Sequence, residues 1–256
     1  MKNYIHTADK SAIPTVTILG VEIADINMPW LMRFTDENLS ALSGDYICVA
    51  NVHTTVEAYG NPDFLSVQNG GIMAIPDGGP LSDEGRKRGA KQIERTTGPD
   101  YMGEIFKVSA QKGYRHYFFG STPETLEKLI INITRDFPGI SVVGFCSPPF
   151  RALTEEEDRE IIENICSAEP DFLWVGLGAP KQENWMAAHQ GRVKGLMVGV
   201  GAGFDYFAGN ISRAPEYMQK HNLEWLYRLM QEPKRLFKRY FITNSKFIWN
   251  AVIRGK

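Results

Sequence analysis

Two glycine-rich segments carry residue types that could bind an anion. Residues 172–185 read FLWVGLGAPKQENW, and residues 198–205 read VGVGAGFD. Each segment begins with apolar, strand-forming residues, turns on glycines and then favours a helix. Glycine lets backbone N–H groups approach a ligand closely, and the N-terminus of a helix attracts negative charge. Either segment alone could be an ordinary turn, but the pair predicts a ligand crevice at the carboxyl ends of two strands.

Asp77 is the first candidate for acid–base chemistry. It follows the apolar run 71–75 and belongs to the sequence Pro-Asp-Gly-Gly at 76–79. That sequence is common in simple turns. However, loops at the carboxyl ends of strands are where α/β proteins place reacting groups. Asp205, which follows the second glycine segment, is the other candidate, and it could equally cap a helix.

Several common site types are missing from the sequence. Both glycine segments lack the third glycine of the dinucleotide-binding fingerprint, and there is no P-loop motif. The five histidines have no metal-ligand spacing, and no Asp-x-Asp pair is present. We therefore expect neither a metal nor a cofactor. An NAD(P)-dependent oxidoreductase stays open as an alternative enzyme class.

The elements that must position these residues follow an α/β pattern. Apolar strands alternate with helical patterns from residue 46 to about 205. This alternation predicts a mostly parallel sheet flanked by helices, Rossmann-like but without dinucleotide binding. Two short strands are expected within 15–26, and a short helix is expected at 36–43.

The last 45 residues differ from the rest in charge. Ten Lys and Arg against three Glu give residues 212–256 a net charge of +7, which leaves −9 on residues 1–211. Large apolar residues lie between the basic ones. We therefore predict an α/β catalytic domain at 1–211 and a helical appendage at 212–256. The appendage suits an anionic membrane surface, but a terminal helix docked on the sheet fits equally. A non-enzymatic membrane adaptor is the third functional class, and we expect no nucleic-acid partner.

Cysteine usage and hydropathy favour a cytoplasmic protein. The three cysteines are odd in number and have no Cys-x-x-Cys spacing. Reduced, buried thiols are the expected state. The first 15 residues lack the apolar region of a secretory signal. No run reaches the ~18 apolar residues of a membrane span.

A set of motifs occurs in an order shared with a known enzyme family. They are IPDG at 75–78, RTTG at 95–98, GAPKQE at 178–183, GVGAGFD at 199–205, RAP at 213–215, EWLYR at 224–228 and EPKR at 232–235. Together they resemble the WecG/TagA/CpsF glycosyltransferases, glycosyltransferase family 26. The likeness runs from about residue 15 to 245.

The resemblance implies an inverting transfer from a UDP-sugar to an undecaprenyl-diphosphate-linked saccharide. The transferred sugar would be a hexose or N-acetylhexosamine, of the N-acetylmannosamine type or glucose. The product would serve the synthesis of bacterial cell-surface polysaccharide. The enzyme would be peripheral on the inner face of the cell membrane, held there by its appendage. A homo-oligomer would cover the apolar surface of the appendage away from the membrane.

The resemblance also assigns roles to individual residues. Asp77 would be the general base, Asn51 and Arg95 would line the sugar and phosphate site, and Gln182 would contact the donor. Val49 stands where some members of the family have Thr. Arginines of the appendage would close over the diphosphate: Arg228, Arg235 and Arg239, with Lys238 as an alternative to Arg239. The remaining residues of the predicted substrate site are Gly78, Gly178, Glu183, Gly201 and Asp205.

Overall fold

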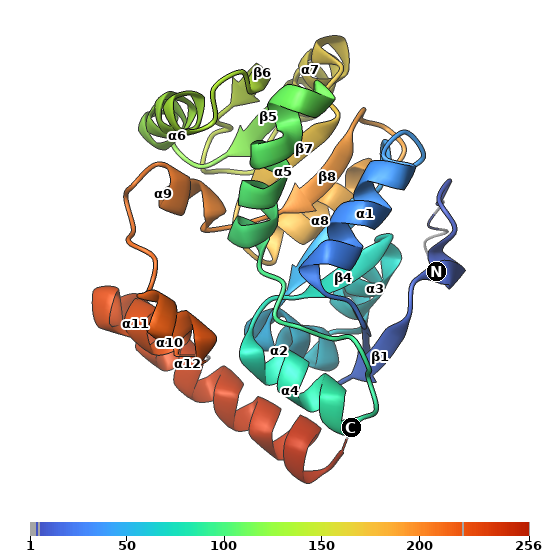
Figure 1. Cartoon of the computed structure of the whole chain (residues 1–256), viewed down its shortest axis with the longest axis vertical. Helices are drawn as coiled ribbons and strands as arrows, with labels where there is room; N and C mark the ends of the chain where they lie inside the picture. The colour runs from blue at the N-terminus through green and yellow to red at the C-terminus, as the bar shows by residue number, and fades with distance from the viewer. Residues whose placement is uncertain (1–3, 5, 222, 256) are drawn as a thin grey trace.

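An eight-stranded sheet runs through the molecule (Figure 1). The computed structural model describes residues 4, 6–221 and 223–255, without the side chains of Glu216, Lys220, Arg235 and Arg239. The strand order is β1-β2-β4-β3-β8-β7-β5-β6, and every neighbouring pair is parallel except the hairpin β1–β2. The strands are β1 Thr15–Ile18, β2 Val21–Ala24, β3 Tyr46–Ala50, β4 Met73–Pro76, β5 Arg115–Gly120, β6 Ser141–Cys146, β7 Phe172–Gly176 and β8 Leu196–Gly199. The predicted α/β class is confirmed.

Strand side chains alternate between two hydrophobic cores, one on each face of the sheet. In β3, Ile47 and Val49 belong to one core, whereas Tyr46, Cys48 and Ala50 belong to the other. Successive residues of a strand point to opposite faces, so an entirely apolar strand must be covered on both sides. This is why β3 reads as a continuous apolar run in the sequence.

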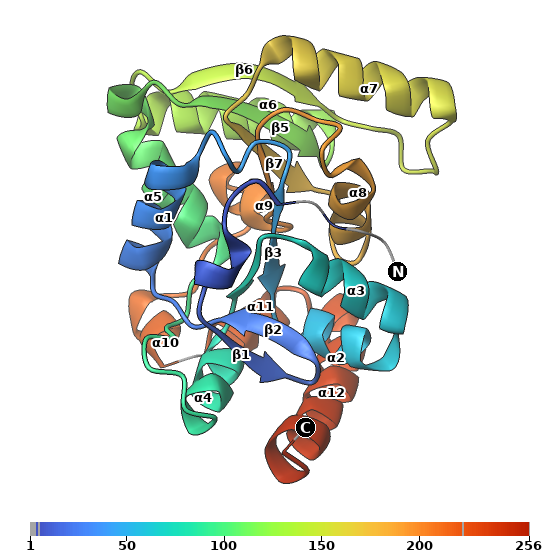
Figure 2. The same ribbon diagram turned by 90° about the vertical axis from the view of Figure 1, so that its right-hand side faces the viewer.

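Helices cover both faces (Figure 2). One face carries α1 Met28–Asn38, α5 Gly98–Lys112, α6 Pro123–Asp136 and α9 Gly203–Phe207. The other carries α2 Val52–Gly60, α3 Pro62–Gly70, α4 Gly79–Lys87, α7 Glu155–Ala168 and α8 Lys181–His189. A short 3-10 turn, η1 Lys10–Ala12, precedes β1. The three-layer arrangement buries both faces of the parallel sheet.

The chain leaves the two central strands in opposite directions. After β3 it enters α2 on one face, and after β8 it enters α9 on the other. Strands β3 and β8 are neighbours, so their carboxyl ends form a topological switch point, where α/β proteins bind ligands. The ends of β4 and β7 flank this point on either side. The four strand ends lead into the loops that carry Asn51, Asp77, Gly178 and Gly201.

Residues 212–255 form the C-terminal segment. It contains α10 Glu216–Lys220, α11 Glu224–Gln231, α12 Pro233–Phe247 and a π-helical turn, η2 Ile248–Ile253. In Figure 1 these helices lie together beside the α/β body, where α12 packs along α2. Phe247 and Ala251 enter the core on the α2 face, and Arg88 donates to the Ala251 carbonyl at 2.9 Å. Within the described residues, none of the helices combines the length and the apolar character needed to cross a bilayer.

The first helix differs from its prediction. The sequence predicts a helix at 36–43, but α1 spans Met28–Asn38. It begins earlier because the side-chain oxygen of Asn27 accepts the Trp30 N–H at 3.0 Å, and Pro29 occupies the first turn. The sequence shows no capping box at this position, so the prediction overlooked the single capping residue Asn27.

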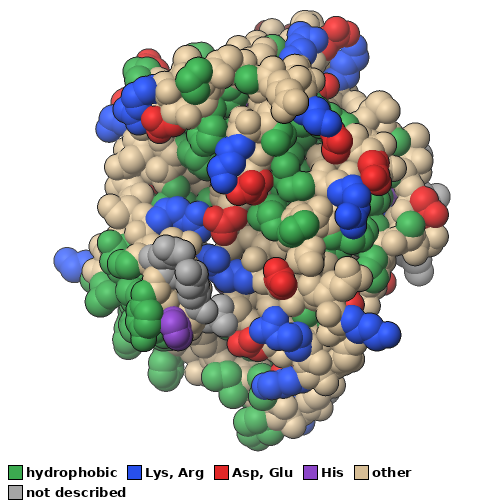
Figure 3. All heavy atoms as spheres, in the orientation of Figure 1, with side chains coloured by type: hydrophobic (Ala, Val, Ile, Leu, Met, Phe, Trp, Pro, Cys, Tyr) green, Lys and Arg blue, Asp and Glu red, His purple; other side chains and the backbone are tan. Residues whose placement is uncertain are grey.

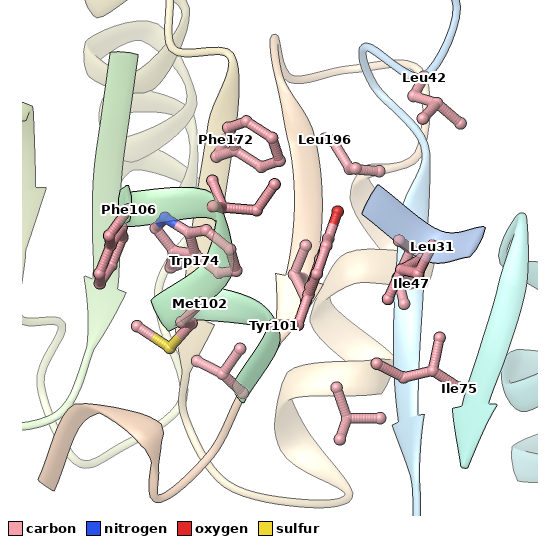
Figure 4. Close-up of a cluster of buried hydrophobic side chains, with 14 of the residues drawn as sticks. Leu31, Leu42, Ile47, Ile75, Tyr101, Met102, Phe106, Phe172, Trp174 and Leu196 are labelled. Carbon is pink, nitrogen blue, oxygen red and sulfur yellow. The ribbon is translucent and has the colours of Figure 1, made fainter. Parts of the chain in front are cut away.

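Aromatic rings fill the centre of the first core (Figure 4). Phe172 and Trp174 stack with their ring centroids 5.4 Å apart, and Phe106 contacts Trp174 edge-on. Trp174 donates its indole N–H to Nδ1 of His116 at 3.1 Å. Burial lowers the pKa of His116 to about 3, so the ring stays neutral and keeps an acceptor nitrogen. This packing fixes β7, whose carboxyl end carries the first glycine segment.

Two positions on α6 test how far the core determines stability. Leu129 is fully buried, whereas Ile131 on the same helix is 66% exposed. Leu129→Ala should lower the free energy of unfolding by about 2–5 kcal/mol because it leaves a cavity. Ile131→Ala should change it by less than about 0.5 kcal/mol. Urea unfolding followed by tryptophan fluorescence measures both, and equal losses would contradict the assigned packing.

Candidate active site

Asp77 lies where β4 ends beside β3. Its backbone N–H donates to the Ala50 carbonyl at 2.7 Å, which continues the β3–β4 ladder by one step. Gly78 then turns the chain into α4 with a φ of +126°. A side chain would strain this conformation, so glycine lets the turn place Asp77 at the mouth of the strand. The Asp77 side chain is partly exposed at this edge of the sheet.

The surroundings of Asp77 suit a proton acceptor. The pKa of Asp77 is raised to about 6, mainly by partial burial of the carboxylate, and the charges of Glu224 and Asp100 act in the same direction. Arg95 and Arg228 act in the opposite direction. This pKa lies just below neutral pH, so at neutral pH the carboxylate is mostly ionised and is still a useful base.

Arg95 approaches the same edge from the segment that precedes α5. The backbone N–H of Thr96 donates to the Pro76 carbonyl at 2.8 Å, which ties this segment to the end of β4. A Cβ added at Gly98 would lie 3.4 Å from both the Val200 Cα and the Val49 side chain. The N-terminus of α5 therefore sits over the ends of β3 and β8, where its backbone N–H groups favour an anion.

Two arginines and two carboxylates form a closed ring of ion pairs, which we call the charge ring. Arg95 pairs with Glu224 and lies 3.6 Å from Asp100. Arg213 pairs with Asp100 and lies 3.8 Å from Glu224. Asp100 is partly desolvated, but hydrogen bonds from Arg213 and Thr97 still hold its pKa below the ordinary value. The charge ring joins the α5 region to the C-terminal segment.

Arg228 of α11 also reaches this region. Its guanidinium lies 5.8 Å from the centre of the Tyr206 ring, and that of Arg213 lies 5.7 Å from the same ring. Cation–π attraction of this kind stabilises both guanidinium groups beside the same ring. The structure thus brings Arg228, predicted from the resemblance, to within electrostatic reach of Asp77.

Asn51 caps α2 at the end of β3. Its side-chain oxygen accepts the N–H groups of His53 at 3.0 Å and Thr54 at 3.2 Å. Thr54 returns a bond to the backbone N–H of Asn51 at 3.0 Å, which completes a capping box. In the described part of the chain the amide nitrogen of Asn51 has no hydrogen bond, so it remains for a ligand.

Gln182 links the two glycine segments. Its Oε1 accepts the Gly178 N–H at 3.2 Å. Its Nε2 would lie 3.0 Å from a Cβ added at Gly199 and 3.9 Å from one at Gly201. Gly178 and Gly201 have φ values of +78° and +51°, and nothing lies within 4 Å of a Cβ added at Gly178. The first glycine segment therefore borders open space, as an anion-binding turn requires.

Glu183, which is predicted to bind substrate, faces inward. Its side chain has no exposed surface, and its Oε1 accepts the Nε2 of Gln182 at 2.9 Å. Burial raises the pKa of Glu183 to about 7. The carboxyl group is buried in this conformation, and a contact between Glu183 and substrate stays a prediction.

Two further predictions have separate outcomes. Asp205 lies inside α9, whose N-cap is Ala202, and its carboxylate accepts the Asn210 amide at 3.1 Å. It is therefore not a helix cap, and a role in substrate binding stays a prediction. Arg235 and Arg239 belong to α12, but their side chains lie outside the described part of the structure.

The structure adds residues that sequence reasoning did not assign to the site. Asp100 and Tyr206 were missed entirely, and Arg213 and Glu224 were noted only as parts of motifs. Their places in RAP and EWLYR were the available signal. In the described residues, no group of three or more His, Cys, Asp and Glu side chains could hold a metal ion.

The chain is similar to known proteins over most of its length. The model of the glycosyl transferase WecG/TagA/CpsF family matches residues 16–256. A protein of Bacillus spizizenii named N-acetylglucosaminyldiphosphoundecaprenol N-acetyl-beta-D-mannosaminyltransferase is 30% identical over 203 residues, which is 79% of this chain and 76% of the relative. Two further relatives with the same name are each 26% identical to this chain. The Bacillus subtilis protein matches over 86% of this chain and 85% of its own length. The protein from Staphylococcus aureus strain MW2 matches over 89% of this chain and 89% of its own length.

These matches confirm the predicted enzyme class and leave the oxidoreductase and adaptor alternatives without support. The chain belongs to the glycosyl transferase WecG/TagA/CpsF family.

Proposed function

We propose that this glycosyltransferase moves a hexose or N-acetylhexosamine, with N-acetylmannosamine favoured, from a UDP-sugar to N-acetylglucosaminyldiphosphoundecaprenol. The sugar and the acceptor are those in the names of its relatives. The observation that carries the proposal is that Asp77 lies within electrostatic reach of both Arg95 of the α/β body and Arg228 of the C-terminal segment. One base and a cationic clamp are the parts that such a transfer needs.

The proposed reaction is a single displacement with inversion. Asp77 accepts the proton of an acceptor hydroxyl while that oxygen bonds to the anomeric carbon of the donor sugar. The bond from this carbon to the diphosphate breaks, and UDP leaves with the electron pair. Arg228 and Arg95 would offset the charge that develops on the departing diphosphate. Helix N-termini at the switch point would add to this stabilisation.

The donor would lie along the carboxyl ends of four adjacent strands. These are β4 with Asp77, β3 with Asn51, β8 with Gly201 and β7 with Gly178. At the usual strand spacing they extend over about 14 Å, which suits an extended nucleotide sugar. Gln182 would contact the donor from the β7 side.

The surface of the C-terminal segment supports a membrane-bound acceptor. Among the described residues, ten of the fourteen exposed large hydrophobic side chains lie between Tyr217 and Ile253, including Phe237, Phe241 and Trp249. Figure 3 shows hydrophobic side chains gathered over the C-terminal helices. Exposed Lys234, Lys238, Lys246 and Arg254 flank them. Apolar side chains edged by cations favour an anionic bilayer surface.

We propose on this basis that residues 212–256 act as a separate unit, which both closes the site and holds the enzyme on the inner face of the membrane. Away from a bilayer, a second copy of the chain would cover the same apolar side chains.

Replacement of the base should separate chemistry from binding. Asp77→Asn should lower kcat by at least about 100-fold, while UDP affinity changes little. The melting temperature should not fall, because the substitution removes a charge that burial destabilises. Transfer assays, calorimetry with UDP and thermal unfolding give the three readouts. Asp83→Asn, which alters an exposed side chain of α4, is the matched control. A normal kcat for Asp77→Asn would refute the assignment.

The pH dependence of transfer should report the titration of Asp77. The carboxylate must be ionised to accept a proton, and its pKa is raised to about 6. We therefore expect kcat/KM to be low at pH 5, to rise through pH 6 and to level off above pH 7. Asp83→Asn should leave this profile unchanged. A profile that is flat from pH 5 to 8, with chemistry rate-limiting, would contradict the proposal.

Exposed aromatics of α12 should control membrane binding. Phe237 and Phe241, 63% and 67% exposed, stack on each other at the surface. The double substitution Phe237→Ser/Phe241→Ser should abolish co-sedimentation with phosphatidylglycerol vesicles, and activity on a short-chain, water-soluble acceptor should remain. Phe150→Ser alters an 82% exposed ring outside the segment and should have no effect. Retained vesicle binding by the double variant would argue against this surface.

A further inference from the structure

A buried chain of hydrogen bonds holds the first glycine segment to α8. The Gly178 N–H donates to Oε1 of Gln182, and Nε2 of Gln182 donates to Oε1 of Glu183. The backbone donor at Gly178 requires the oxygen of the Gln182 amide to face it. Nε2 must then face Glu183, so the whole amide has one orientation. Among the described residues, Nε2 donates only to Glu183, which leaves its second N–H for a ligand.

Burial of the Glu183 carboxyl group destabilises the fold, and its own contacts do not offset this penalty. The side chain is fully buried, and in the described structure its second oxygen, Oε2, has no hydrogen bond. Cys48 and Glu57 lie close enough to interact electrostatically with Glu183, and neither of these side chains is a cation. A buried carboxyl group with an unpartnered oxygen destabilises a fold. An apolar residue would fill the same space at lower cost, so a contribution to stability does not explain its presence.

We infer that Glu183 is a positioning residue, which fixes the Gln182 amide and, through it, the Gly178 turn in the conformation that binds the nucleotide diphosphate of the donor. This inference rests on the proposed UDP-sugar donor. Glu183 does not touch the substrate. It acts through the direction of a single hydrogen bond, because only an acceptor at the position of Oε1 keeps the Gln182 N–H groups in place.

Two conservative substitutions distinguish position from charge. Glu183→Gln keeps the reach and the acceptor oxygen but removes the acid. Glu183→Asp keeps the acid but is one methylene too short to reach Gln182. With UDP as the probe in calorimetry, Glu183→Asp should weaken binding by about 5- to 10-fold, the value of one lost hydrogen bond. Glu183→Gln should stay within about threefold of the wild type. A purely electrostatic role predicts the reverse order.

The Gln182→Ala background shows whether Glu183 acts through Gln182. In that background Glu183→Asp should produce no further loss of UDP affinity, because the group that it positions is already gone. Glu57→Gln removes a nearby carboxylate outside the hydrogen-bond chain and should leave UDP affinity unchanged. Thermal unfolding of each variant shows whether weaker UDP binding comes from unfolding or from a misplaced Gln182 amide.

The outcomes also separate this inference from the proposed function. Additive losses in the Gln182→Ala background, or tighter binding by Glu183→Asp than by Glu183→Gln, would overturn the role of Glu183 alone. If the wild-type chain did not bind UDP, the proposed donor would fail, and the inference would fail with it.

Discussion

The charge ring is the interaction on which the arrangement of the site depends. Arg95 and Asp100 belong to the α/β body, whereas Arg213 and Glu224 belong to the segment that follows α9. The Arg95 and Glu224 side chains are only 19% and 16% exposed, so breaking their pair would leave a poorly solvated charge on each side. Removing one partner of such a partly buried ion pair destabilises the fold, because the other charge remains poorly solvated. The charge ring therefore couples the position of α11 to the position of the α5 N-terminus.

The same charged residues influence the pKa of Asp77, which we assign as the general base. Asp77 is not part of the charge ring, but two of its members, Glu224 and Asp100, raise its pKa, while Arg95 lowers it. Burial is the larger effect, and the neighbouring charges largely offset one another. A carboxylate at the mouth of a strand thus acquires a pKa of about 6, mainly through burial. Binding of an anionic donor beside Arg95 would disturb this balance, so protonation of Asp77 and occupation of the site are linked.

Much of the site follows from local sequence patterns. Asp77 could be located because an apolar run passes directly into Pro-Asp-Gly-Gly, and the strand order then places it beside Asn51. The charge ring could not be predicted, because it joins residues 113 and 129 positions apart whose pairing depends on tertiary packing. The sequence motif also does not reveal that the Glu183 carboxylate faces inward while the neighbouring Gln182 amide bridges two turns. Capping of α1 by Asn27 was also invisible to a search for paired capping residues.

The separation in sequence between the two halves of the charge ring has a consequence for synthesis of the chain. Arg95 and Asp100 leave the ribosome more than a hundred residues before Arg213 and Glu224. Until then the nascent α/β body holds two opposite charges at an open switch point and lacks the cation contributed by α11. A chain that still lacks its last residues cannot form the charge ring. Translation thus sets the order of assembly, because the charge ring can form only after Glu224 has emerged.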